Sequence, residues 1–208
     1  MMHAENRFMR GVVAMLLLFA VHPLLAAGRP AVQARVLMSV LPASAWQKVS
    51  RAEGVRTGGT ASDPVEIQVI VDVNCPYCAR LYRMFRRGHP GVAVRWVPID
   101  YLLKDSGRVA AAILQSPDPV ASLDTNFLHY HNDYKDSHGG YLPPAGKHFA
   151  LPRANVELAQ DWARWGGSTP MILFRDDRGR ILRASGARRD VVDQVLMHVR
   201  SSLPAYGE

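Results

Sequence analysis

The sequence predicts an α/β fold in which a β-α-β unit is followed by a helical insertion and then by a β-β-α unit. Three observations predict it. Val65 to Val73 is a short, nearly continuous run rich in β-branched residues, which is typical of a strand buried on both faces. A helical pattern and an alternating strand over 92–97 follow, and such a unit implies parallel strands with a right-handed crossover. Two strands, 171–174 and 181–184, and a helix over 188–202 close the chain.

The first 27 residues have the pattern of a secretory signal peptide. Arg7 and Arg10 precede an apolar run over 12–21, and a proline and several small residues follow it. The run is shorter than the roughly 20 apolar residues that a membrane span needs. We therefore expect residues 1–27 to be removed on export, with an uncleaved N-terminal anchor as the alternative.

The rest of the chain divides into a lead-in and one domain. Residues 28–63 are expected to form a linker helix and a linker, because the stretch 57–64 is rich in glycine, threonine and serine. The domain is expected over 64–205. Its helical insertion covers about 100–165 and contains a polar, histidine-rich stretch, 129–148, with no assigned role.

The charge balance points to a solvated surface. The chain has 25 Lys and Arg against 18 Asp and Glu, a formal net charge of +7. A basic balance can indicate nucleic acid or an anionic membrane. Here the positive residues are scattered, with only short clusters such as Arg86-Arg87. We expect no nucleic-acid partner for an exported protein of this kind.

The two cysteines of the chain form a Cys-x-x-Cys pair, Cys75-Pro76-Tyr77-Cys78, where the first buried strand hands over to a helix. Free N–H groups and the macrodipole at a helix N-terminus stabilise a thiolate, which is the reactive form of cysteine. Cys78 lies one turn further along the same side and can attack a mixed disulfide formed at Cys75. Pro76 suits the first helical turn. The pattern predicts Cys75 as attacking sulfur and Cys78 as resolving sulfur, with no metal or organic cofactor.

Two other interpretations of the pair remain. It could be half of a zinc site, for which the available further ligands are histidines of one polar stretch, His129, His131, His138 and His148. It could also be an inert structural disulfide, although so short a loop gains little stability from closure.

Thr169-Pro170 stands directly before a strand, where a proline is tolerated. A cis peptide bond there would bring the Thr169 backbone towards the cysteines, whereas an ordinary trans proline would only mark a turn. Composition leaves the two open.

Several dispersed motifs together carry a family resemblance. They are Val71-Asp72-Val73-Asn74 before the cysteine pair, Ala110 to Leu114 with Asp118-Pro119, and Ser168-Thr169-Pro170. From about Leu41 onward the chain resembles the periplasmic Dsb thioredoxin-fold proteins, specifically the DsbC/DsbG disulfide-isomerase branch. The lead-in with Trp46 also looks like the helix before the DsbG catalytic domain.

The resemblance implies a thioredoxin fold with an inserted helical subdomain and a cis Pro170 beside Cys75 and Cys78. It implies that the Thr169 backbone pairs with an extended substrate segment, with Pro76 and Tyr77 also contacting substrate. It further implies a periplasmic location, exported cysteine-containing substrates and a membrane-bound redox partner of the Dsb type.

One departure from that branch concerns assembly. Only about 35 residues separate the expected signal peptide from the expected domain, which is too short for the N-terminal dimerisation domain of the isomerases. We therefore expect a monomer, and isomerase, oxidase and reductase activities all remain open. The alternatives are a chaperone or binding module without redox turnover, and a glutaredoxin, which the export signal and the long segment between Cys78 and Pro170 disfavour.

Overall fold

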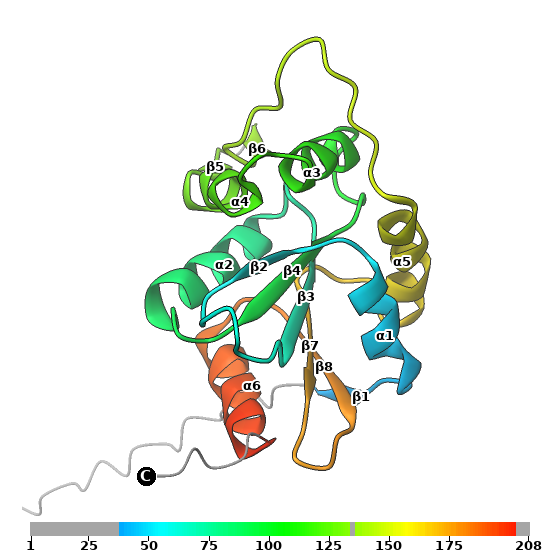
Figure 1. Ribbon diagram of the computed structural model, residues 1–208, viewed down its shortest axis with the longest axis vertical. Coiled ribbons are helices and arrows are strands. Elements are labelled where there is room, and N and C mark those ends of the chain that lie inside the picture. Colours follow the sequence, from blue (N-terminus) through cyan, green and yellow to red (C-terminus); the bar gives the residue numbers. More distant parts are fainter. Residues whose placement is uncertain (1–37, 134–135, 203–208) are drawn as a thin grey trace, which may run out of the picture. The chain divides into compact units, whose positions relative to one another are not determined.

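The computed structural model describes residues 38–133 and 136–202. The expected signal peptide, 1–27, lies outside the described residues. A six-stranded sheet in the order β1-β8-β7-β3-β4-β2 occupies the centre (Figure 1). Its strands are β1 (Ser39–Val40), β2 (Val55–Thr57), β3 (Ile67–Val71), β4 (Val94–Pro98), β7 (Met171–Arg175) and β8 (Ile181–Ser185).

Pairing within the sheet matches the expected order of elements. β3 and β4 are parallel and are joined by α2 (Pro76–Gly88), as the β-α-β pattern predicted. β3 also pairs antiparallel with β7, and β7 pairs antiparallel with β8. The register sets Val69 beside Trp96 on one side and Ile172 on the other. The predicted α/β architecture of the thioredoxin fold is therefore confirmed.

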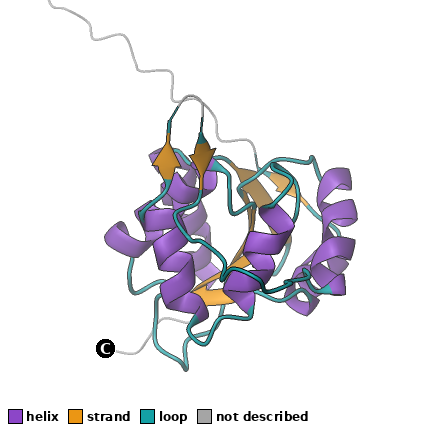
Figure 2. Cartoon of the chain, turned by 90° about the horizontal axis from the view of Figure 1, so that it is seen from above, coloured by secondary structure: helices purple, strands orange, loops and turns teal. Residues whose placement is uncertain are grey.

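The sheet is covered on both faces, which explains why β3 is a continuous apolar run. Successive side chains of a strand point to opposite faces. Val69 and Val71 accordingly belong to one hydrophobic cluster and Ile70 to another. α2 and α6 (Arg189–Ser202) contribute to the first cluster, and α1 (Ser44–Arg51) and α5 (Arg153–Arg164) to the second. Seen from above, helices lie on both sides of the strands (Figure 2).

The expected linker over 28–63 needs correction for its described part. β1, α1 and β2 all lie before Pro64, yet β1 and β2 form the two edges of the sheet and α1 packs on one face. Residues 58–63 form a tight turn rather than a free tether. Gly58 has φ +70, and a Cβ there would lie 2.2 Å from the Val92 carbonyl oxygen. The sheet thus begins well before the expected boundary.

The expected insertion over about 100–165 is also too long. α3 (Ser106–Leu114), α4 (Pro119–Leu128) and the hairpin β5 (His131–Asn132) and β6 (Ser137–His138) lie beyond the end of the sheet where α2 begins (Figure 1). α5, by contrast, packs against the sheet together with α1, through Leu158 and Trp162. α5 is therefore part of the helical layer that covers one face of the sheet and not part of the insertion.

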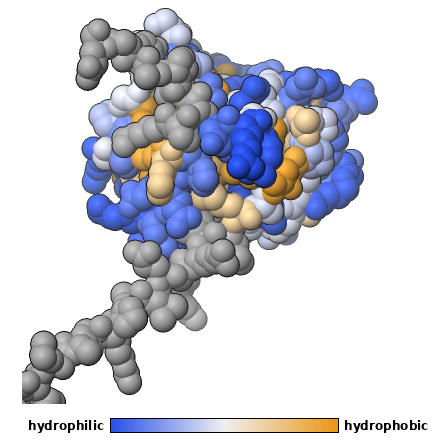
Figure 3. All heavy atoms as spheres, turned by 90° about the horizontal axis from the view of Figure 1, so that it is seen from below, coloured by the Kyte–Doolittle hydropathy of each residue, from blue (hydrophilic) through white to orange (hydrophobic). Residues whose placement is uncertain are grey.

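The face of the molecule seen from below is mostly polar. In the view from below, hydrophilic residues cover most of the visible described surface and hydrophobic ones form separate patches (Figure 3). Among the residues that the structure describes, no helix is long and apolar enough to cross a membrane.

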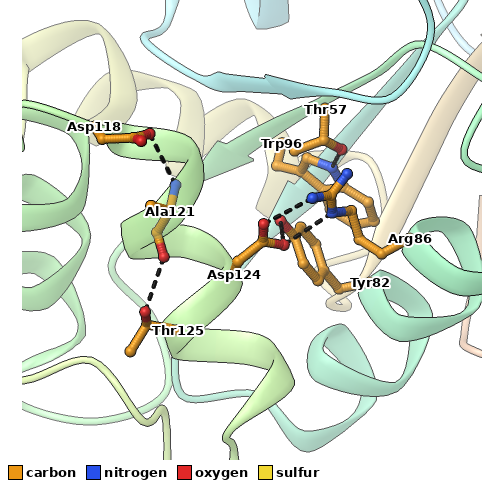
Figure 4. Close-up of polar contacts among 8 residues, drawn as sticks. All are labelled: Thr57, Tyr82, Arg86, Trp96, Asp118, Ala121, Asp124 and Thr125. Carbon is orange, nitrogen blue, oxygen red and sulfur yellow. Dashed lines mark hydrogen bonds and ion pairs between the residues drawn. The ribbon is translucent and has the colours of Figure 1, made fainter.

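A polar cluster joins α2 to α4 (Figure 4). Asp124 accepts hydrogen bonds from Tyr82 Oη at 2.8 Å, Arg86 Nε at 2.8 Å and an Arg86 terminal nitrogen at 2.7 Å. α4 itself begins at Pro119, and the Asp118 carboxylate caps it by accepting from the Ala121 N–H. This cluster fixes the insertion on the helix that carries the cysteines.

Candidate functional site

The cysteine pair stands where β3 ends and α2 begins. Cys75 is the N-cap residue of α2, with extended φ −88 and ψ 120, and Pro76 occupies the first helical turn. The Cys75 side chain is 4% exposed and Cys78 is fully buried. Tyr77 is exposed, with 60% of the residue accessible to solvent. Cys75 thus keeps a small accessible area, and Cys78 lies deeper in the core.

The pKa values of the two thiols are shifted in opposite directions. The pKa of Cys75 is lowered from 9.0 to about 6, chiefly by a hydrogen bond from Cys78. Burial acts to raise this pKa, but hydrogen bonds from the Thr169 side chain and from the backbone N–H groups of Cys78 and Tyr77 lower it further. Burial raises the pKa of Cys78 well above its usual range, and the hydrogen bond and charge at Cys75 raise it further. At neutral pH, Cys75 is therefore the nucleophile and Cys78 holds its proton.

Thr169 and Pro170 lie beside the cysteines across the fold. The peptide bond between them is cis, as the resemblance implied. The Cys75 sulfur lies 3.6 Å from the Thr169 carbonyl oxygen, to which the thiol donates a hydrogen bond when it is protonated. Pro170 is buried, while Thr169 is partly exposed. The cysteine pair and the Thr169-Pro170 pair, which are about 90 residues apart in sequence, thus meet in one site.

Asp72 anchors the loop on the other side of the site. Its fully buried carboxylate accepts four hydrogen bonds, from the N–H groups of Asn74, Tyr101 and Leu102 and from the Ser106 hydroxyl, at 2.8–3.0 Å. Burial raises the pKa of Asp72 although all four hydrogen bonds act to lower it. The charge of Asp72 in turn opposes ionisation of Cys78.

Asn74, directly before Cys75, connects the site to the insertion. Its buried amide donates to Ser106 Oγ, its side-chain oxygen accepts from the Gly139 N–H at 3.1 Å, and its carbonyl accepts from Tyr130 Oη at 2.7 Å. The hairpin needs a glycine at 139, because a Cβ there would lie 1.9 Å from Asn126 Oδ1. The insertion is therefore part of the site.

Tyr130 lies close enough to Cys75 for the thiolate charge to shift its pKa. Its pKa is raised to about 12, first by burial and then by the charges of Cys75 and Asp72. The sequence had identified the cysteines, their two intervening residues and the Thr-Pro pair, but it had assigned no role to Asp72, Asn74 or Tyr130. A usable signal was the pair of polar residues between the buried strand and Cys75, since polar residues at such positions need buried partners.

The histidine-rich stretch forms a small hairpin of its own. The rings of His131 and His138 pack with centroids 4.9 Å apart, and His138 Nδ1 lies 2.7 Å from the Gly139 carbonyl oxygen. Within residues 38–133 and 136–202, no three His, Cys, Asp or Glu side chains come together in a way that could hold a metal ion.

Comparison with known proteins rests on structure alone. No protein-family model and no curated protein sequence matches the chain. Solved structures do match: a disulfide interchange protein from Neisseria gonorrhoeae has a TM-score of 0.50 and 18% identity, over 70% of this chain and 94% of that one. ScsC from Proteus mirabilis, in a compact conformation, has a TM-score of 0.50 and 21% identity, over 80% of each chain.

At 18% and 21% identity, these likenesses concern the fold alone. They do not single out the DsbC/DsbG branch to which the sequence motifs pointed. The chain has the thioredoxin fold found in Dsb-type proteins.

Proposed function

We propose that this chain is an exported thiol–disulfide oxidoreductase that exchanges disulfides with cysteine-containing exported proteins. One observation carries the proposal. Cys75 combines a pKa lowered to about 6 with a position 3.6 Å from the Thr169 carbonyl oxygen, while Cys78 beneath it keeps its proton. An inert structural disulfide requires neither this difference in acidity nor a backbone group beside the outer sulfur.

The exchange proceeds in two steps. In the oxidised form, a substrate thiolate attacks the sulfur of Cys75, the Cys75–Cys78 bond breaks, and Cys78 leaves as a thiolate that takes up a proton. A second substrate thiolate then attacks the substrate sulfur of the mixed disulfide, and Cys75 leaves as a thiolate. Two electrons pass from the substrate dithiol to the enzyme, and the reverse sequence reduces a substrate disulfide.

The acidity of Cys75 favours the oxidising direction. A thiol of low pKa is a good leaving group, and its stable thiolate lowers the free energy of the reduced enzyme. Isomerisation would begin with attack of the Cys75 thiolate on a substrate disulfide and end without net electron transfer. We place oxidation first and isomerisation and reduction second.

Substrate would bind as an extended segment along the backbone of Thr169, with Pro76, Tyr77 and Pro170 around the reacting sulfur. We further propose a periplasmic location, supported by the signal-like pattern of residues 1–27. A membrane-bound partner of the Dsb type would reoxidise the pair, and the mature chain would act as a monomer.

The test is a redox titration of the purified protein in glutathione buffers, read by the alkylation state of the cysteines. Reversible two-electron cycling is expected, with Cys78→Ala trapped as a mixed disulfide and Cys75→Ala forming none. Failure of the wild-type protein to cycle would overturn the proposal. If a Cys75→Ser/Cys78→Ser protein still fully prevents aggregation of unfolded client proteins, the alternative hypothesis of a chaperone without redox turnover would be supported instead.

A second assay compares the rates of the oxidase and isomerase activities. The protein is given either a reduced or a scrambled substrate, and recovery of the native substrate is measured. Faster oxidation of the reduced substrate than rescue of the scrambled one is expected. Size-exclusion chromatography of the mature protein tests the monomer.

A further inference from the structure

A pocket of about 320 Å³ is lined in part by Pro76 and Tyr77, the two residues that directly follow Cys75. Of the described residues that line it, four come from the first two turns of α2, and the other two are Tyr130, directly before β5, and Asn132 in β5: Pro76, Tyr77, Arg80, Arg83, Tyr130 and Asn132. Because Pro76 and Tyr77 directly follow Cys75, a group bound here lies next to the reacting atom.

The pocket carries two positive charges that have no ionic partner among the described residues. Arg80 and Arg83 are three residues apart on α2, which places them on one face of the helix. Among the described residues, neither guanidinium has a hydrogen bond or an ion pair. Arg86, one turn further, is instead held by both oxygens of Asp124. Among the described residues that line the pocket, none is acidic.

Two of the other described lining residues, Tyr130 and Tyr77, are aromatic. Tyr130 is buried, and its hydroxyl donates to the Asn74 carbonyl oxygen at 2.7 Å, so that its ring holds one position. Tyr77, also in the lining of the pocket, is 60% exposed. Such walls can cover the methylene stem of a ligand while the guanidinium groups take its charged end.

This chemistry matches a carboxylate. A guanidinium offers paired N–H donors in the geometry of a carboxylate, and charged hydrogen bonds of this type are stronger than neutral ones. A site with one sign of charge also raises the local concentration of ligands with the opposite sign.

We propose that Arg80 and Arg83 select acidic polypeptide substrates, binding a carboxylate that lies close to the reacting cysteine of the substrate. The selection rests on the proposed disulfide exchange and deepens it. The carboxylate forms no covalent bond. The Cys75 thiolate attacks the substrate sulfur, the substrate disulfide breaks, and the leaving thiolate departs while both arginines keep their charge.

The test uses capped peptides with one cysteine, activated as a mixed disulfide with 2-thiopyridine and carrying Glu, Gln or Lys beside that cysteine. Release of the thiopyridone gives the second-order rate constant with the reduced protein. At low salt the Glu peptide is expected to react about three- to tenfold faster than the Gln peptide, and the Lys peptide more slowly. Added salt is expected to reduce the difference.

The ratio of Glu to Gln rates is then compared among variants. Arg80→Gln/Arg83→Gln is expected to bring the ratio close to one. Arg87→Gln is the matched control, because Arg87 lies exposed on the same helix but outside the pocket, and it should keep the wild-type ratio. Taking the ratio within each protein cancels any general loss of folded enzyme.

The outcomes separate this inference from the function on which it rests. If no peptide reacts, the oxidoreductase itself fails. If Glu and Gln peptides react equally, or if the double variant keeps the preference, the arginine pocket is overturned while the enzyme stands. A mixed disulfide of glutathione is assayed in the same way. If its reaction alone is slowed by the double substitution of Arg80 and Arg83, the acidic polypeptide is the wrong substrate class.

Discussion

Two identical thiols three residues apart behave differently because of what surrounds each of them. Cys75 sits at the start of a helix, where Cys78, Thr169 and backbone N–H groups stabilise its negative charge. Cys78 is sealed in the core beneath it, where burial disfavours any charge. The difference assigns attack to one sulfur and resolution to the other.

The pH dependence of alkylation tests this assignment. The rate of reaction of Cys75 with iodoacetamide is expected to rise with an apparent pKa near 6, because only the thiolate reacts. Cys78→Ala should move that pKa upward, since the hydrogen bond from Cys78 is the largest cause of the lowering. A wild-type profile centred near 9 would contradict the geometry.

Asp72 is a residue whose hydrogen bonds matter more than its charge. Asp72→Asn would turn an NH₂ group towards backbone N–H groups such as those of Tyr101 and Leu102 and leave buried donors unpaired. A loss of about 2–4 kcal/mol in the free energy of unfolding is expected. Urea unfolding measures it, with Asp100→Asn as control, because exposed Asp100 accepts a single bond from Gly107. Equal losses in the two variants would refute this account.

At the scale of elements, the junction between α2 and α4 holds the insertion to the catalytic helix. Burial acts to raise the pKa of Asp124, but hydrogen bonds from Arg86 and Tyr82 lower it overall. Both partners of the ion pair are mostly shielded, with 29% and 23% of their side chains exposed. The charge of Asp124 therefore stabilises the folded state more than a surface ion pair would.

The junction has a defined pH dependence. Because the folded-state pKa of Asp124 lies below its usual value, its stabilisation is present above about pH 4 and is lost as the pH falls further. Asp124→Asn is expected to lower the free energy of unfolding by about 1–2 kcal/mol at neutral pH, with a smaller difference near pH 3.

Urea unfolding at both pH values provides the measurement. Glu157→Gln is the control, because the Arg153–Glu157 pair is exposed and should contribute little. A difference for Asp124→Asn that stays constant with pH would show that the ion pair is not its source.

At the scale of the whole molecule, the acidity of Cys75 links redox state to stability. In the reduced protein its folded-state pKa is about 6, below the ordinary 9.0, so ionisation stabilises the fold above pH 6. The contribution is about 1 kcal/mol at pH 7, grows towards pH 9 and is lost as the pH falls through 6. Such stabilisation of the reduced form favours release of the disulfide to substrates.

Thermal or urea unfolding of the reduced protein at about pH 5 and pH 8 checks this linkage. The advantage of the reduced wild-type protein over Cys75→Ser should be larger at the higher pH. The oxidised protein, whose sulfurs cannot titrate, should lack this component. A reduced protein whose advantage is the same at both pH values would exclude thiolate stabilisation.

Prediction from sequence succeeded where the pattern was local and strong. The apolar runs of β3 and β7 and the helical spacing of α2 identified these elements, because each buries its own side chains in a regular period. The edge strands β1 and β2, only two and three residues long, have no period to detect. α5 was assigned to the insertion because its partner α1 lies about 100 residues earlier in the chain.

Local patterns were enough to predict the α/β order, the cysteine pair and its place at the start of a helix, because strand, helix and thiol are neighbours along the chain. The folded chain was needed to reveal that Thr169 lies beside Cys75, that Asp72 and Asn74 bind the insertion, and that Arg80 and Arg83 share a pocket with Tyr130. These contacts escape prediction because acidity and substrate selection depend on burial and on hydrogen bonds between distant segments, which no local pattern contains.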